Sequence, residues 1–343
     1  MNSSNPRITQ QDVADKAGVS RGIVSYVINN GPRQVAPETR ERVLQAIAEL
    51  GYRPNVHAQQ LLRKQWGTVA GKDLGLILPN VALLRRPYYG SVLSGIHQAA
   101  HDNHHRIRFM HFFAELHDPV RFNALIHREE ISGLILMSLD QCIHTAADKK
   151  LIEQIRERID NIVCLEWYAE GLPSVSFDRA GAAYLAAQHL IQLGYRSIIY
   201  LGIEDERVNG YLRACMENQL PVNPTSVFFA RNSETGYQEV ERLISAGIIP
   251  RAIVAGSDEV AFGILRCLRQ HQITVPHEIA IASIDNIPLA AYAAPPLTTV
   301  DVPKIDMGRV AVKVVIKNGK DKDSTTVANL LPTKLIVRES SGA

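Results

Sequence analysis

The stretch TQQDVADKAGVSRGIVSYVINN, residues 9–30, is the most informative part of this chain of 343 residues. Thr9 followed by Asp12 has the pattern of a capping box, and Gly18 can end a first short helix. Ser20 can cap a second helix that carries its apolar residues on one face. Two short helices joined by a turn that contains glycine indicate a helix-turn-helix, a motif that places its second helix in the DNA major groove.

A third helix is expected to begin near Pro37 and to end at Gly51, because apolar residues recur between them at helical spacing. Residues 1–54 would then form an all-α DNA-binding domain. The alternative is a generic helical bundle with a solvated polar face. The polar face of the second helix carries hydrogen-bonding side chains rather than Glu–Lys pairs, which favours contact with DNA.

The polar positions of this surface divide by the part of the DNA that they can reach. The residues expected on base edges or phosphates are Arg21, Ser25 and Tyr26, and those expected on the DNA backbone are Thr9, Ser20 and Asn29.

The segment NVHAQQLL, residues 55–62, predicts a helix too short to be stable alone in water. Asn55 can cap it, Ala58 is small, and Leu61 is available to insert into a base step of the minor groove. We therefore expect residues 55–72 to form a hinge helix and linker that order on DNA. An ordinary interdomain linker with one helical turn is the alternative.

From Asp73 onward, short apolar runs alternate with amphipathic segments, which is typical of βαβ units and parallel sheets. The runs form two similar series, so residues 73–343 are expected to form an α/β core of two lobes. The expected strands are 73–79, 106–113, 133–138, 161–167, 196–202, 226–230, 252–256 and 279–285.

Open parallel sheets bind ligands beyond the carboxyl ends of their strands, so residues just after the strands are candidates for a small-molecule site. Aromatic rings suit the apolar faces of a ligand, while Arg and Asp suit hydroxyl groups or an anion. Each such residue alone could be an ordinary surface or structural residue, but the set predicts a site for a polar metabolite. Its members are Tyr88, Tyr89, Trp167, Arg207, Arg231, Asp258 and Asp285.

Composition and motifs exclude several other classes of protein. No apolar run has the length of a signal peptide or a membrane span, which predicts a cytoplasmic protein. The net charge is +2, with +4 in residues 1–65 and −2 in the remainder, so the basic charge lies in the DNA-binding part. The four cysteines are far apart and contain no C-x-x-C pair, which indicates reduced core thiols.

Nothing in the sequence predicts catalysis or a cofactor. It contains no G-x-G-x-x-G, Walker, G-x-S-x-G or H-E-x-x-H motif, so we expect no catalytic residues and no cofactor. The segment HQAAHDNHH, residues 97–105, is rich in histidine, and His97 and His101 are four residues apart on an expected helix. Polar helix faces often carry histidines without a ligand, so we expect no metal there.

Taken together, these residues resemble the lactose-repressor-like (LacI/GalR) transcriptional regulators over nearly the whole chain. The similarity lies in several motifs in the same order: QQDVADKAGVSRGIVSYVINN, VAPETRERVLQAIAELGYRPN, AQQLL, PYYGSVLSGI, HLIQLGYRSIIYLG, RVNGY, SDEVAFGIL, PPLTTVDVP and LIVRES. The resemblance implies a repressor that binds a pseudo-palindromic operator as a homodimer. It also implies a core like that of the periplasmic sugar-binding proteins, with an effector, a sugar or similar metabolite, between the lobes.

The resemblance also assigns positions. Gly22 joins the recognition-helix surface, Leu61 falls on the intercalating leucine, and Arg207 and Asp285 fall on effector-contacting residues. It implies an N-lobe of about 73–177 and 303–318 and a C-lobe of about 178–302 and 319–343. Gly22 departs from the pattern, because relatives usually carry a base-reading side chain there.

Two other classes of function are weighed against this one. A transport receptor with a vestigial N-terminal domain would need the signal peptide that we do not find, and an enzyme of sugar chemistry would need a pair of carboxylates or a phosphate loop. In the regulator, effector binding would shift the population of lobe arrangements and so change the affinity of the hinge helices for DNA.

Overall fold

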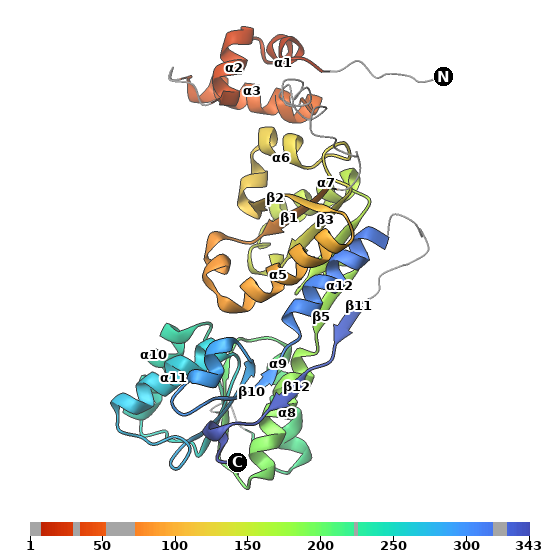
Figure 1. The fold of residues 1–343 in the computed structure, drawn as a ribbon. Coiled ribbons are helices and arrows are strands. Elements are labelled where there is room, and N and C mark those ends of the chain that lie inside the picture. The colour runs from red at the N-terminus through yellow and green to blue at the C-terminus, as the bar shows by residue number, and fades with distance from the viewer. Residues whose placement is uncertain (1–7, 30–34, 53–72, 223–225, 318–327) are drawn as a thin grey trace. The chain divides into compact units, whose positions relative to one another are not determined.

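The computed structural model describes residues 8–29, 35–52, 73–222, 226–317 and 328–343 (Figure 1). The expected hinge residues Asn55, Ala58 and Leu61 lie outside these ranges. The chain divides into two compact units, one of residues 1–85, 94–175 and 308–328 and the other of 86–93, 176–307 and 329–343. We call residues 8–52 the head, the α/β part of the first unit the first lobe, and the second unit the second lobe.

The head contains the three predicted helices, α1 (Gln10–Ala17), α2 (Arg21–Asn29) and α3 (Pro37–Leu50). The capping box is confirmed: Asp12 N–H donates to Thr9 Oγ1, and Thr9 N–H donates to the Asp12 carboxylate. Gly18 and Gly51 end α1 and α3 in the left-handed conformation that glycine favours. Buried Val13, Val24, Val43, Ile47 and Tyr52 form the core of the head.

The first lobe is built on a six-stranded sheet of order β11-β5-β4-β3-β1-β2. The central strands are buried along their length, which explains their continuous apolar sequence, and the pairs from β2 to β5 are parallel. The strands of this sheet are β1 (Asp73–Leu78), β2 (Arg106–Phe112), β3 (Gly133–Met137), β4 (Ile162–Leu165), β5 (Ser174–Phe177) and β11 (Ala328–Leu331). The helices near it are α5 (Pro87–Asp102), α6 (Pro119–Leu125), α7 (Ala146–Arg158) and α12 (Lys304–Lys317).

The second lobe repeats this design with the strand order β12-β10-β9-β8-β6-β7, parallel except for the antiparallel pair β10 and β12. The strands are β6 (Ile198–Gly202), β7 (Val227–Phe229), β8 (Ala252–Ala255), β9 (Ala280–Asp285), β10 (Thr298–Asp301) and β12 (Lys334–Ile336). Its helices are α8 (Arg179–Gln192), α9 (Glu206–Glu217), α10 (Ser233–Ser245) and α11 (Asp258–Gln270). In Figure 1, α8 and α9 pack together, as do α10 and α11.

Glycine lets these helix pairs approach closely. A Cβ atom on Gly210 of α9 would overlap the backbone carbonyl of Ala180 in α8, and one on Gly263 of α11 would overlap the carbonyl of Ser233 in α10. Gly236 of α10 faces the Val260 carbonyl of α11 in the same way, with a Cβ–O separation of 2.7 Å. The two helix pairs are therefore joined backbone to backbone, and these positions require glycine for space rather than for an unusual φ.

All eight predicted strands exist, with ends within two residues of those expected. The sequence analysis missed β5, β10, β11 and β12, which have three or four residues each. Residues 329–343 belong to the second unit, although β11 pairs into the first sheet beside β5. None of the described helices combines the length and hydrophobicity that a membrane span requires.

Candidate DNA-binding surface and effector site

The predicted DNA-binding residues of the head lie just before α1 and just before or within α2. Arg21, Gly22 and Tyr26 are exposed, and Ser25 is half-buried. Thr9 and Ser20, each just before a helix, are exposed as well. The side chain of Asn29 lies outside what the structure describes.

Two contacts fix this surface. The Arg21 Nε donates to Gln10 Oε1 at 3.4 Å, which links α2 to α1. Buried Val24 and Val27 hold α2 on the core of the head, so the opposite face of the helix is turned outward. An exposed helix face with a cation and hydroxyl groups, held by a packed opposite face, can enter a groove of DNA.

The candidate effector site of the second lobe centres on Arg207, the second residue of α9. Asp205 caps this helix through a hydrogen bond from Arg207 N–H to Oδ1 at 3.0 Å, and its Oδ2 lies 3.2 Å from Arg207 Nη1. The guanidinium also lies over the Phe177 ring at 5.6 Å. The side chain is only 9% exposed, yet its Nε and Nη1 make no hydrogen bond among the described residues, and the Nη1–Asp205 contact is an ion pair without hydrogen-bond geometry.

Burying a guanidinium with two nitrogens that make no hydrogen bond is costly, and the negative charge of Asp205 offsets part of this cost. Burial lowers the pKa of Arg207, but Asp205 and Tyr200 outweigh it and the pKa rises overall. The side chain is therefore a permanent cation with donors to spare. It can bind an oxygen-rich ligand.

Asp285, the last residue of β9, lies close to this cation. Burial raises its pKa well above 3.8, and nearby Asp258 raises it further, while Arg207, Lys304 and Arg86 act in the opposite direction. Its backbone has a φ of 119°, which L-residues rarely adopt. The Lys304 Nζ donates to the Asp285 carbonyl oxygen and to Val302 O at 2.9 Å, which holds this conformation.

An aromatic pair completes the site. Tyr88 and Tyr89 at the start of α5 are buried and meet edge to face, with ring centroids 5.1 Å apart. Lys304 Nζ lies 5.9 Å from the centre of the Tyr88 ring, and Arg86, over Tyr89 at 5.4 Å, also pairs with Glu259 at 2.6 Å. The site thus combines aromatic rings, cations and an acid.

Three predicted effector residues lie elsewhere or are already engaged. Trp167 packs in the core of the first lobe, and its Nε1 donates to Leu136 O at 2.7 Å. Asp258 is fully buried and accepts hydrogen bonds from Ser283, Thr299 Oγ1 and Ile287 N–H, so its carboxylate serves the fold. The side chain of Arg231 is exposed.

The sequence analysis did not select Arg86, Asp205 or Lys304. Arg86 and Lys304 stand before or at the beginning of helices rather than directly after strands, so the strand-end rule passes over them. Asp205 carried a usable signal, because Asp is a preferred helix N-cap and the acidic Glu206 follows it in the first turn.

Comparison with known proteins identifies the family of the chain. Residues 9–55 match the family model described as bacterial regulatory proteins, lacI family, and residues 187–341 match that of a periplasmic binding protein-like domain. Catabolite control protein A of Priestia megaterium is 30% identical, over 97% of this chain and 99% of that protein.

Two solved structures have the same fold. The complex of the transcriptional regulator CelR with cellobiose has a TM-score of 0.70 at 26% identity, covering 97% of this chain and all of the other. The lac repressor dimer bound to operator and the anti-inducer ONPF has a TM-score of 0.67 at 23% identity, covering 98% and 100%. The protein therefore belongs to the LacI family and is a DNA-binding transcription regulator with an effector-binding domain, not an enzyme.

Proposed function

We propose that this regulator is a cytoplasmic repressor that binds a pseudo-palindromic operator as a homodimer, and that a polyhydroxylated metabolite of the sugar class controls it from the second lobe. The observation that carries the effector class is the buried Arg207 guanidinium, whose Nε and Nη1 have no acceptor among the described residues. The dimer and the operator are supported by the lac repressor structure.

The chemistry around Arg207 favours a sugar over a simple anion. Arg207 offers donors, whereas Asp285 offers acceptors, and a hydroxyl group can satisfy both because it donates and accepts. The rings of Tyr88 and Tyr89 suit the apolar C–H face of a pyranose or furanose. Cellobiose, bound by the related CelR, is a molecule of this kind.

Control requires that the effector bind the repressing and released arrangements with different affinity. We assign DNA binding to residues 1–54 and the hinge to 55–72. The effector core is 73–343, with Tyr88, Tyr89, Arg207 and Asp285 in the site. Asn55, Ala58 and Leu61 are proposed to act at the operator centre, and replacing Leu61 by alanine should weaken specific binding more than nonspecific binding.

The experiment has two stages. Selection from random duplex pools at near-physiological salt should recover a pseudo-palindrome, and Arg21→Ala should weaken binding to it, while Arg213→Ala, at an exposed position of α9, should not. A screen of sugars by operator release and thermal shift then identifies the effector. Arg207→Met should weaken its binding by roughly 10- to 100-fold, as expected when hydrogen bonds to a charged group are lost.

Each stage can fail separately. Recovery of no motif by the apo-protein and by the protein with each sugar would contradict operator binding. Unchanged effector affinity in Arg207→Met would contradict the proposed effector site but not the proposed function as a regulator.

A further inference from the structure

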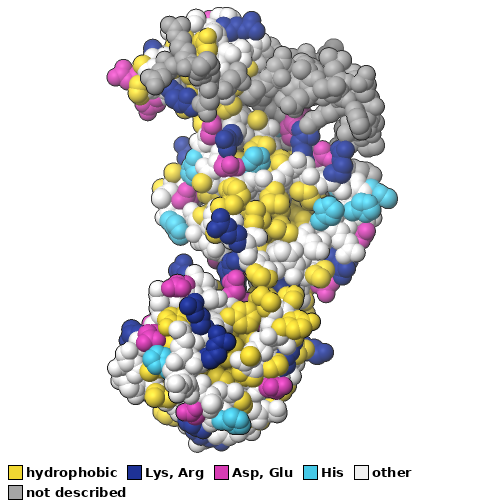
Figure 2. All heavy atoms as spheres, turned by 60° about the vertical axis from the view of Figure 1, so that its left-hand side comes forward, with side chains coloured by type: hydrophobic (Ala, Val, Ile, Leu, Met, Phe, Trp, Pro, Cys, Tyr) yellow, Lys and Arg dark blue, Asp and Glu magenta, His cyan; other side chains and the backbone are white. Residues whose placement is uncertain are grey.

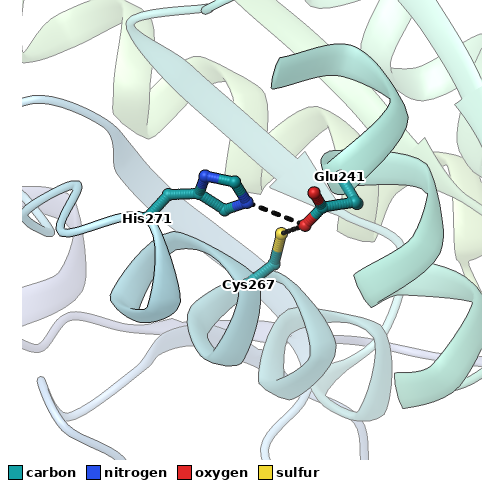
Figure 3. Close-up of side chains that lie close together, drawn as sticks. All are labelled: Glu241, Cys267 and His271. Atoms are coloured by element: carbon teal, nitrogen blue, oxygen red, sulfur yellow. Dashed lines mark hydrogen bonds and ion pairs between the residues drawn. The ribbon is translucent and has the colours of Figure 1, made fainter. Parts of the chain in front are cut away.

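A second group of polar side chains lies in the second lobe, on the helix pair α10 and α11 (Figure 3). Cys267 lies in the last turn of α11, and His271, four residues on, is the C-cap residue that directly follows this helix, so both side chains lie on the same side. Glu241 of α10 points toward both of them. One atom from each side chain, a sulfur, a nitrogen and an oxygen, lies within 4.8 Å of the others.

The spacing of these atoms is close to that of metal ligands. Cys267 Sγ lies 3.5 Å from Glu241 Oε2, and His271 Nε2 lies 2.8 Å from the same oxygen. Tetrahedral zinc with bonds of about 2.0–2.3 Å separates its S and O ligands by roughly 3.6 Å and its N and O ligands by roughly 3.3 Å. The S–O distance already fits, and the N–O distance needs about half an ångström more. Rotation of two partly exposed side chains can supply this.

The surroundings allow an ion to enter and then to be held. The side chains of His271 and Glu241 are 34% and 39% exposed, whereas Cys267 is buried, so an ion reaches the sulfur from the solvent side. Gly263 and Gly236 join α10 and α11 backbone to backbone, which fixes the helices that carry the ligands. The ligands are thus preorganised on rigid elements.

We propose that Glu241, Cys267 and His271 form a binding site for a divalent cation of the zinc class. Thiolate, imidazole and carboxylate are the donors that zinc prefers, and a water molecule would complete a tetrahedron. On binding, the thiol of Cys267 gives its proton to solvent, and the hydrogen bonds among the three side chains are replaced by bonds to the metal. The ion ties α10 to α11 and stabilises the second lobe.

The histidine-rich segment 97–105 is the competing site in the chain. His97 and His101 are four residues apart on the exposed face of α5, but within the described ranges no third ligand joins them. Replacing His101 therefore provides a control for surface histidines. Cys215, buried in α9 of the same lobe, provides one for thiols.

The test uses the full-length protein, with Zn²⁺ followed by calorimetry and Co²⁺ used as a coloured substitute. We expect one Zn²⁺ per chain that survives in His101→Gln and Cys215→Ser. We also expect a thiolate-to-cobalt charge-transfer band that is lost in Cys267→Ser. His271→Gln, at an exposed position that should not disturb folding, is expected to weaken Zn²⁺ binding by about 100-fold. Loss of a residue that only supports a metal ligand already weakens metal binding by about 10- to 100-fold, and His271 is proposed as a ligand itself. A cobalt complex without the thiolate band, or Zn²⁺ binding unchanged in His271→Gln, would overturn the proposal.

Discussion

Asp205 contacts Arg207 twice, with one carboxylate oxygen on the backbone N–H and the other beside the guanidinium. The two roles can be separated by substitution. Asp205→Asn keeps a helix cap but loses the charge, whereas Asp205→Ala loses both. The free energy of unfolding of the alanine variant should therefore be about 1 kcal/mol lower than that of the asparagine variant. Both should weaken effector binding. Urea denaturation and calorimetry measure the two effects, and equal stability of the two variants would contradict the capping role.

Asp285 should make the stability of the second lobe depend on pH. Its pKa is raised in the folded protein above the ordinary 3.8, so the folded state holds the proton more tightly than the unfolded state does. The stabilisation that this proton gives the folded state is fully present below about pH 4, and it is lost as the pH rises through the raised pKa of the folded protein. Asp285→Asn should remove its share of this decline and also weaken effector binding. Thermal unfolding across pH measures it, with exposed Glu234→Gln as the control that should keep the wild-type profile.

Gly22 should be replaceable by alanine with a gain in stability. It lies inside α2 with ordinary φ, and an added Cβ would meet only Ser20 Oγ, at 3.8 Å. Alanine should therefore stabilise this helix by up to about 1 kcal/mol, seen as slower hydrogen exchange over residues 21–29. Gly18→Ala, at a φ of 65°, should accelerate exchange in the head. Faster exchange in Gly22→Ala would show that this helix needs glycine for another reason.

Gly263→Ala should destabilise the second lobe. The new methyl group would overlap the Ser233 carbonyl and force α10 and α11 apart, at a cost of about 1–3 kcal/mol. Gly90→Ala in α5, where nothing lies within 4 Å of the new atom, is the matched control and should be neutral or stabilising. Chemical denaturation separates them, and equal stabilities would mean that the helix pair relaxes without cost.

Leu289 and Tyr292, in the short 3-10 helix Pro288–Tyr292, are 56% and 84% exposed. Figure 2 shows, on one face of the protein, hydrophobic side chains interspersed with acidic and basic ones. If the proposed dimer covers these two residues, Tyr292→Glu should raise its dissociation constant at least tenfold, since a charge would be buried. Sedimentation velocity reports this, with Tyr168→Glu in the first lobe as the comparison. A dimer unaffected by Tyr292→Glu would place the interface elsewhere.

Long apolar runs were predictable as strands, because a strand that is covered on both faces of the sheet buries nearly every side chain and is therefore apolar along its length. Strand β10, TTVD, and strand β5, SVSF, have too few apolar residues in sequence to stand out. Their burial depends on neighbours distant in the chain. Strand β11, ANLL, lies at the edge of its sheet and has no buried residue, and four residues are too few to show a strand period.

The candidate site was predictable only as far as it depends on the position of a residue relative to a strand in the sequence. The strand-end rule selected Arg207 and Asp285, which the structure brings close to one another, since residues that follow parallel strands share one edge of a sheet. It also selected Trp167 and Asp258, because the rule does not say which way a side chain turns. The indole turned into the core, and the carboxylate turned toward Ser283 and Thr299.

The strand order has a consequence for how the protein is made. The first sheet contains β11, residues 328–331, and the second contains β12, residues 334–336. The three helices of the head are synthesised first. The strands up to and including β10 are all synthesised before β11 completes the first sheet and β12 completes the second. The head can therefore fold, and meet DNA, while both lobes still expose an unpaired strand edge. The two sheets should gain their last strands almost together, because only residues 332–333 separate β11 from β12.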